Sequence, residues 1–191
     1  MRKNVFPSGF LSIFYSLGSK PLQIWDVQAH NDGHVKTVFD NDICSPVWEL
    51  MSPNVSLSSI ICPNNPKLSL GMKLPVLTMI VKNVNKFFTF EVSIKYDKDM
   101  TRRFRASNLN AARLNVSTST YIVPLRLKFG WKTVQLNLKD LCKCVYCTNY
   151  QETMKIQVHA SYRIRRIYFL DRVYEDEELP AEFMLYLPLK Q

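Results

Sequence analysis

Apolar and polar residues alternate along much of the chain, which is the pattern of strands with one buried face. In segment 87–96, apolar side chains occupy every second position from Phe88 to Tyr96. Residues 74–81 are instead almost continuously apolar, which predicts a strand that is buried on both faces. The alternation recurs in three further segments, 121–127, 133–138 and 154–160.

Helices are expected at only two places. An acidic residue, Asp140, follows one of the predicted strands and favours a helix from about Leu138 to Tyr146. A short helical turn is predicted over residues 175–179, ended by Pro180. Gly, Pro, Asn and Asp separate the strands as turn residues. Many short strands at this spacing predict an all-β fold, a sandwich or barrel.

The N-terminal stretch MRKNVFPSGFLSIFYSLGS joins a basic start to apolar residues. Its apolar part is interrupted by Pro7 and Gly9, and no small-x-small cleavage site follows, so we expect a strand of the fold rather than a leader. No run reaches the roughly 18–20 apolar residues of a membrane helix, and no membrane partner is expected. One domain over residues 1–191 is the simplest organisation.

Charge divides the chain into two unequal parts. Residues 171–191 contain six acidic and two basic residues, a net charge of −4, whereas the preceding 170 residues carry +13. The whole chain carries +9. A protein with so basic a body is expected to bind an acidic partner.

Arginines form two clusters within the basic body. In an extended RRFR segment, Arg103 and Arg105 would share one side while Phe104 faces the core. Guanidinium groups beside aromatic residues can bind phosphates and bases, and equally protein carboxylates. Pairing within the chain remains an alternative for the second cluster, which the acidic C-terminal stretch follows closely. The candidate partner-binding residues are Arg102, Arg103, Arg105, Arg163, Arg165 and Arg166.

Catalytic signatures are absent from the sequence: it has no phosphate-cradling glycine loop, no G-x-S-x-G and no H-E-x-x-H. His30 and His34 fall in a turn region beside Asp32, where we expect solvated side chains. His159 falls on the polar face of a predicted strand, and we expect it at the surface. No catalytic residue and no enzymatic activity are therefore predicted.

Cysteines are odd in number, five, and unevenly spaced, which is typical of a reducing compartment rather than a disulfide framework. Cys142, Cys144 and Cys147 have a metal-like spacing, but zinc prefers four ligands and no second pair accompanies them. On a helix the three thiols would also point in different directions. No metal and no cofactor are expected.

Longer segments resemble a known family from nearly one end of the chain to the other. The chain is similar to the cilia- and flagella-associated protein 20 family, the inner-junction proteins of ciliary doublet microtubules. The segments that carry the resemblance are SGFLSIFYSLGSKPLQIWD (8–26), DNDI (40–43), LGMKLP (70–75), FFTFEV (87–92), RRFRASN (102–108), TNYQETMKIQVHA (148–160), RIRRIYF (163–169) and ELPAEFMLYLP (178–188).

This resemblance implies a single β-sandwich of jelly-roll type, similar to carbohydrate-binding modules but serving as a structural protein. It implies a non-enzymatic protein of the axoneme that contacts tubulin and the Parkin co-regulated protein, where the B-tubule closes onto the A-tubule. It also implies roles in axoneme stability, ciliogenesis, ciliary beating and tubulin modification. Basal bodies and centrioles are expected locations, and the nucleus is kept as a further candidate.

The chain departs from the family pattern at residues 28–32, 111–119 and 142–147, which indicates a diverged or tissue-specialised copy such as one used in sperm. Two other functions stay open at this point. A glycan-binding module would need exposed aromatic residues, but Trp25 and Trp131 lie in apolar surroundings and are expected in the core. Nucleic-acid binding would fit the charge, but no recognition motif supports it.

Overall fold

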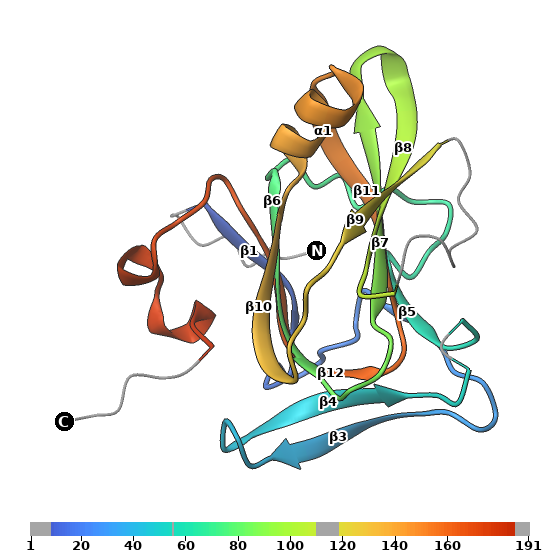
Figure 1. The fold of residues 1–191 in the computed structure, drawn as a ribbon, viewed down its shortest axis with the longest axis vertical. Helices are drawn as coiled ribbons and strands as arrows, with labels where there is room; N and C mark the ends of the chain where they lie inside the picture. The colour runs from blue at the N-terminus through green and yellow to red at the C-terminus, as the bar shows by residue number, and fades with distance from the viewer. Residues whose placement is uncertain (1–8, 55, 110–118, 186–191) are drawn as a thin grey trace.

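The computed structural model describes residues 9–54, 56–109 and 119–185, and these form two packed β-sheets with one α-helix (Figure 1). The first sheet contains β10 (Gly130–Asn137), β6 (Val76–Asn83), β12 (Tyr162–Leu170), β4 (Ser45–Met51) and β3 (His34–Asp40) in that order, and β1 (Phe10–Tyr15) also pairs with β12. The second contains β2 (Asp26–Gln28), β5 (Ser59–Cys62), β11 (Tyr150–His159), β7 (Thr89–Tyr96), β8 (Met100–Ser107) and β9 (Thr120–Pro124). The predicted β-sandwich is confirmed.

Strands β6 and β7 supply much of the interface between the sheets. Every residue of β6 is buried, as the continuous apolar run predicts. In β7, Phe90, Val92 and Ile94 are fully buried, and they face Leu77 and other side chains of the first sheet in one core cluster. Burying aliphatic and aromatic side chains is the main stabilising contribution in such a fold.

Helix α1 (Leu138–Tyr146) follows β10 directly and has the bounds that the sequence predicts. The Asn137 side chain accepts a hydrogen bond from the Asp140 amide at 3.3 Å, which caps the first turn. Cys147 ends the helix in a left-handed conformation, and its amide bonds to the carbonyls of Cys142 and Lys143. Because it follows β10 directly, the helix lies at the end of the sandwich where β10 ends (Figure 1).

The N-terminal and C-terminal segments meet on the outer side of the first sheet. Strand β1 is part of this sheet, as expected, and pairs antiparallel with β12. After β12 the chain forms two short helical turns, η3 (Asp176–Glu178) and η4 (Ala181–Phe183). Phe183 lies with its ring centroid 5.0 Å from Phe10 and 4.9 Å from Tyr168, which fastens the acidic segment to the sheet.

The predicted strand at 121–127 is only partly correct. Strand β9 ends at Pro124 and pairs parallel with β8 at the edge of the second sheet. Leu125 and Leu127 continue as a connection that still packs against the core. Of the segment 111–119, which is expected to depart from the family pattern, residues 111–118 lie outside the described part of the chain.

Candidate interaction surface

Strand β8 places its arginines as the alternation predicts. Phe104 is fully buried, while Arg103 and Arg105 lie on the opposite face. Both arginines pair with Glu91 of β7: Arg103 Nη1 lies 3.1 Å from Glu91 Oε2, and Arg105 Nε donates to Glu91 Oε1 at 2.7 Å. The Arg103 side chain is nevertheless 48% exposed, so it is available to a partner.

Glu91 is the buried centre of this cluster, with a side chain only 8% exposed. Burial raises its pKa, but contact with His159 and the charges of Arg105 and Arg103 outweigh burial and lower the pKa to about 2. His159 lies on the polar face of β11, as expected, but it is half-buried rather than fully at the surface. Its side chain is 17% exposed, with Nε2 3.8 Å from Glu91 Oε1.

Arg102 points to the other side of β8, near α1. Its Nε donates to the Tyr96 hydroxyl at 3.3 Å, and its guanidinium lies 5.0 Å from the centroid of the Tyr146 ring. These contacts hold a positive charge against aromatic faces. Arg102 is half-buried, so it is less exposed than Arg103.

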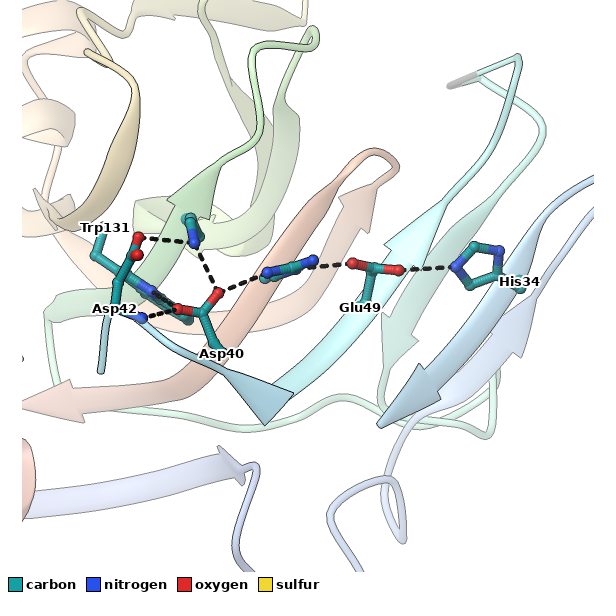
Figure 2. A network of polar contacts seen from close by, with 7 residues as sticks. His34, Asp40, Asp42, Glu49 and Trp131 are labelled. Carbon is teal, nitrogen blue, oxygen red and sulfur yellow. Dashed lines mark hydrogen bonds and ion pairs between the residues drawn. The ribbon is translucent and has the colours of Figure 1, made fainter. Parts of the chain in front are cut away.

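Arg163 belongs to a second, larger network on the first sheet. It bridges two carboxylates, with Nε 2.7 Å from Glu49 Oε2 and Nη1 2.7 Å from Asp40 Oδ2. The network ends at His34, whose Nε2 lies 2.9 Å from Glu49 Oε1, and Figure 2 shows His34, Glu49 and Asp40 in one row. The acids that pair with Arg163 thus come from β3 and β4, and not from the C-terminal acidic segment.

Asp40 is fully buried and is the most heavily bonded member of this network. Lys82 Nζ lies 2.8 Å from Asp40 Oδ2 and also 2.8 Å from Asp42 Oδ2, while Trp131 Nε1 donates to Asp40 Oδ1 at 3.0 Å (Figure 2). Burial raises the pKa of Asp40, but hydrogen bonds from Lys82, Trp131 and Arg163 lower it to about 2. The carboxylate therefore stays ionised and holds two cations in place.

Arg165 and Arg166 are not surface residues, since they are 7% and 4% exposed. The Arg166 guanidinium lies 3.6 Å from the centroid of the Tyr15 ring and 4.6 Å from that of Phe183, and its Nη1 donates to Ser12 at 2.7 Å. Burial lowers the pKa of Arg166. Neither arginine therefore has the exposure expected of a partner contact. The Tyr15 and Phe183 rings cover Arg166, and Arg165 lies at the bulge of β12 between Ile164 and Arg166.

The cysteines of α1 differ in environment, as the helical geometry predicts. Cys142 is buried, whereas Cys144 and Cys147 are exposed. Within the described residues, no three His, Cys, Asp or Glu side chains gather in a way that could hold a metal ion. No helix in the same part of the chain is long and apolar enough to cross a membrane.

The tryptophans lie where the apolar pattern predicts. Trp25 and Trp131 are each 4% exposed, and each donates its indole N–H to a partner inside the protein, Ile13 O for Trp25 and Asp40 for Trp131. Neither indole presents a face on which a sugar ring could stack.

Sequence reasoning missed the acids that organise both arginine clusters, Glu91, Asp40 and Glu49. A local signal existed for Glu91: a tight turn after Tyr96 sets the β7–β8 hairpin register, which pairs Glu91 with Arg105. No local signal existed for Asp40, which is 123 residues from Arg163.

The fold and its two ionic networks define a cationic β-sandwich. Comparison with known proteins supplies its family: residues 1–187 match the CFA20 domain, and the chain belongs to this family. It is 53% identical to cilia- and flagella-associated protein 20 of Chlamydomonas reinhardtii over 191 residues, 100% of both chains. It is 54% identical to the protein of the same name in Paramecium tetraurelia, covering 100% of this chain and 99% of the relative.

Solved structures similar to this one include carbohydrate-binding modules at low sequence identity. A family 11 module from Clostridium thermocellum has a TM-score of 0.45 at 10% identity, covering 90% of this chain and 99% of the module. A xylan-binding domain of family 22 also has a TM-score of 0.45 at 10% identity, with 88% and 100% covered.

Proposed function

We propose that this protein is a non-enzymatic structural component of the axoneme of cilia and flagella. It binds the doublet microtubule at the inner junction, where the B-tubule closes onto the A-tubule. Its partners there are tubulin, the Parkin co-regulated protein and other inner-junction proteins. In this role it supports axoneme stability, ciliogenesis and motility, and basal bodies and centrioles are further places where it acts.

The observation that carries this proposal is the similarity to the relatives. Identity of 53–54% extends over the whole chain, and these relatives are named for their association with cilia and flagella. Function depends on the residues that a surface presents rather than on the fold alone, so the proposal rests on this full-length identity and not on the likeness in fold.

Charge supports an acidic partner such as the microtubule wall. Three carboxylates, those of Asp40, Glu49 and Glu91, are buried and paired with cations, and the chain as a whole is still strongly positive. The net charge of +9 would speed association with an acidic lattice and make affinity fall as salt rises.

Arg103 is the best placed of the six candidate arginines, since its side chain is 48% exposed on the outer face of β8. Arg105 lies beside it and positions Glu91, while Arg102 lies near α1. We therefore place this face of the second sheet at the microtubule. Arg163, with a side chain 27% exposed, contributes less, and Arg165 and Arg166 act inside the fold.

Co-sedimentation with purified microtubules over a salt series tests the proposal. The wild-type protein should pellet with microtubules and be released as salt increases. Arg103→Gln should weaken pelleting by about threefold to tenfold, as the loss of one contact of about 1 kcal/mol predicts. Arg172→Gln is the matched control, because Arg172 is also a half-exposed arginine in an ion pair. Equal pelleting with and without microtubules would contradict the proposal.

A further inference from the structure

A basic pocket of about 540 Å³ lies at the end of the sandwich opposite α1. It forms where the connection from β6 to β7 meets the connection from β9 to β10. Gly130, at the start of β10, pairs with Asn83 at the end of β6, and this pairing brings the two connections together. The volume is within the range of sites that hold small ligands or a few peptide residues.

Side-chain amides fix the walls of this pocket. Asn83 Nδ2 donates to the carbonyl oxygens of Leu127 and Lys128 at 3.0 and 3.4 Å. Asn108 Nδ2 donates to the carbonyl oxygen of Lys86 at 3.2 Å, and its Oδ1 accepts from the Phe88 amide at 2.8 Å. The backbones that carry two of the pocket's cations are therefore held before any ligand binds, which lowers the entropic cost of binding.

Three cations line the pocket and no carboxylate does: Lys86, Arg126 and Lys128. All three are exposed, and within the described residues none has an ion-pair partner. Lys82, one residue before Asn83, differs sharply because it is held by Asp40 and Asp42. The pocket is thus a concentration of uncompensated positive charge, which attracts an anionic ligand.

The rest of the lining is apolar. Phe87 is 51% exposed on the rim, and Leu125 and Leu127 form half-buried parts of the wall. A nucleic acid would be served better by a row of cations along a groove with several flat rings for its bases. Cations gathered around a single hollow with leucine walls fit carboxylates that flank an apolar side chain.

We infer that this pocket binds a short acidic peptide segment of the protein's partner, with one apolar side chain of the peptide against Phe87 and the leucines. Glutamate or aspartate side chains pair with Lys86, Arg126 and Lys128 at the rim. The inference rests on the proposed function, because it assigns a binding site for the acidic partner proposed there. This site is separate from the arginines of β8.

Fluorescence anisotropy with a labelled peptide of glutamate and glycine around one central leucine tests the site directly. The triple variant Lys86→Gln/Arg126→Gln/Lys128→Gln should lose about tenfold or more in affinity, since each rim ion pair is worth a few tenths to 1 kcal/mol. The matched control, Lys67→Gln/Lys73→Gln/Lys139→Gln, removes the same charge from exposed lysines elsewhere and should lose less than about threefold by the same arithmetic. Phe87→Ser, with all cations retained, should also weaken the peptide.

The outcomes separate the two proposals. If the wild-type protein binds microtubules but the pocket variant and the control bind the peptide equally, the pocket inference is overturned and the proposed function stands. If the pocket variant loses the peptide although the wild-type protein never pellets with microtubules, the pocket stands and the microtubule proposal fails. A single-stranded oligonucleotide that binds the pocket more tightly than the peptide would overturn the assignment of a peptide ligand.

Discussion

Arg163 Nη1 lies 2.7 Å from Asp40 Oδ2, across 123 residues of sequence. The same carboxylate oxygen lies 2.8 Å from Lys82 Nζ. One buried acid at the end of β3 therefore compensates two cations from β12 and β6. This ionic contact joins three strands of the first sheet and keeps the charge of Arg163 inside the molecule.

Asp40→Asn should destabilise the protein strongly. The substitution leaves Lys82 and Arg163 partly buried with less negative charge, and breaking one partner of a buried pair costs about 3–5 kcal/mol. Urea denaturation followed by tryptophan fluorescence measures the change in the free energy of unfolding.

Asp42→Asn is the control for this substitution. Asp42 also lies 2.8 Å from Lys82, but its side chain is 54% exposed, and exposed pairs contribute about 1 kcal/mol or less. Equal losses in the free energy of unfolding for the two variants would show that the burial of Asp40 does not make its ion pairs more stabilising than the exposed pair of Asp42.

Glu91 predicts a specific dependence of stability on pH. Its pKa is about 2 in the folded protein against 4.5 for the free side chain, so its contribution is fully present above pH 4.5 and is lost as pH falls toward 2. The shift corresponds to about 3 kcal/mol. Wild type and Glu91→Gln should therefore differ most above about pH 5 and converge only as the pH approaches about 2, as urea unfolding at each pH will measure.

Glu177→Gln is the matched substitution, because Glu177 is exposed and has no ion pair among the described residues. It should change the free energy of unfolding by less than about 0.5 kcal/mol at pH 6. A constant difference between wild type and Glu91→Gln from pH 7 to about pH 2.5 would refute the role assigned to its ionised form.

Arg165→Met should leave stability unchanged or raise it by about 1–2 kcal/mol. The Arg165 side chain is buried, and its Nε and Nη1 have no hydrogen-bond partner among the residues that the structure describes. Replacing an uncompensated buried polar group by an apolar one removes its desolvation cost. Thermal unfolding measures the result. A loss above about 2 kcal/mol would mean that the guanidinium makes a stabilising contact.

Thiol labelling tests the orientation of α1. Burial raises the pKa of Cys62 to about 12, and burial with the charge of Asp97 raises that of Cys142 to about 11. At pH 8 the native protein should therefore react with iodoacetamide at its exposed thiols, Cys144 among them, and leave Cys62 and Cys142 unmodified. Peptide mass spectrometry reads the sites, and equal labelling of Cys142 and Cys144 would contradict the helix register.

Much of the fold could be predicted because its signals are local. The continuous apolar run at 74–81 predicts the buried strand β6, and the Asn137–Asp140 cap with Cys147 beyond it accounts for the bounds of α1. The weakest prediction was the strand at 121–127. Its alternation continues past Pro124, but Pro124 pairs with Ser107, the last residue of β8, so the ladder has no further partner and the chain turns toward β10 instead.

The arginine clusters could be located from sequence but their partners could not. The acidic segment after Arg166 is the nearest source of negative charge, and there Arg172 pairs with Glu178 instead. The order of strands in the first sheet places Asp40 and Glu49 beside Arg163. No pattern in the sequence predicts this order of strands. The pocket lined by Lys86 and Arg126 was missed for the same reason, because two distant connections form it.

A side-chain-resolution map of doublet microtubules tests the central claim, the position at the inner junction, most directly. The density there should follow the two sheets of this protein and carry the side chains of Cys142 and Cys144 on α1 and of Cys147 at its end. The outer face of β8 with Arg103 should lie against tubulin. Density for this chain elsewhere on the doublet, or a map of axonemes from cells that express it in which it is absent, would contradict the account.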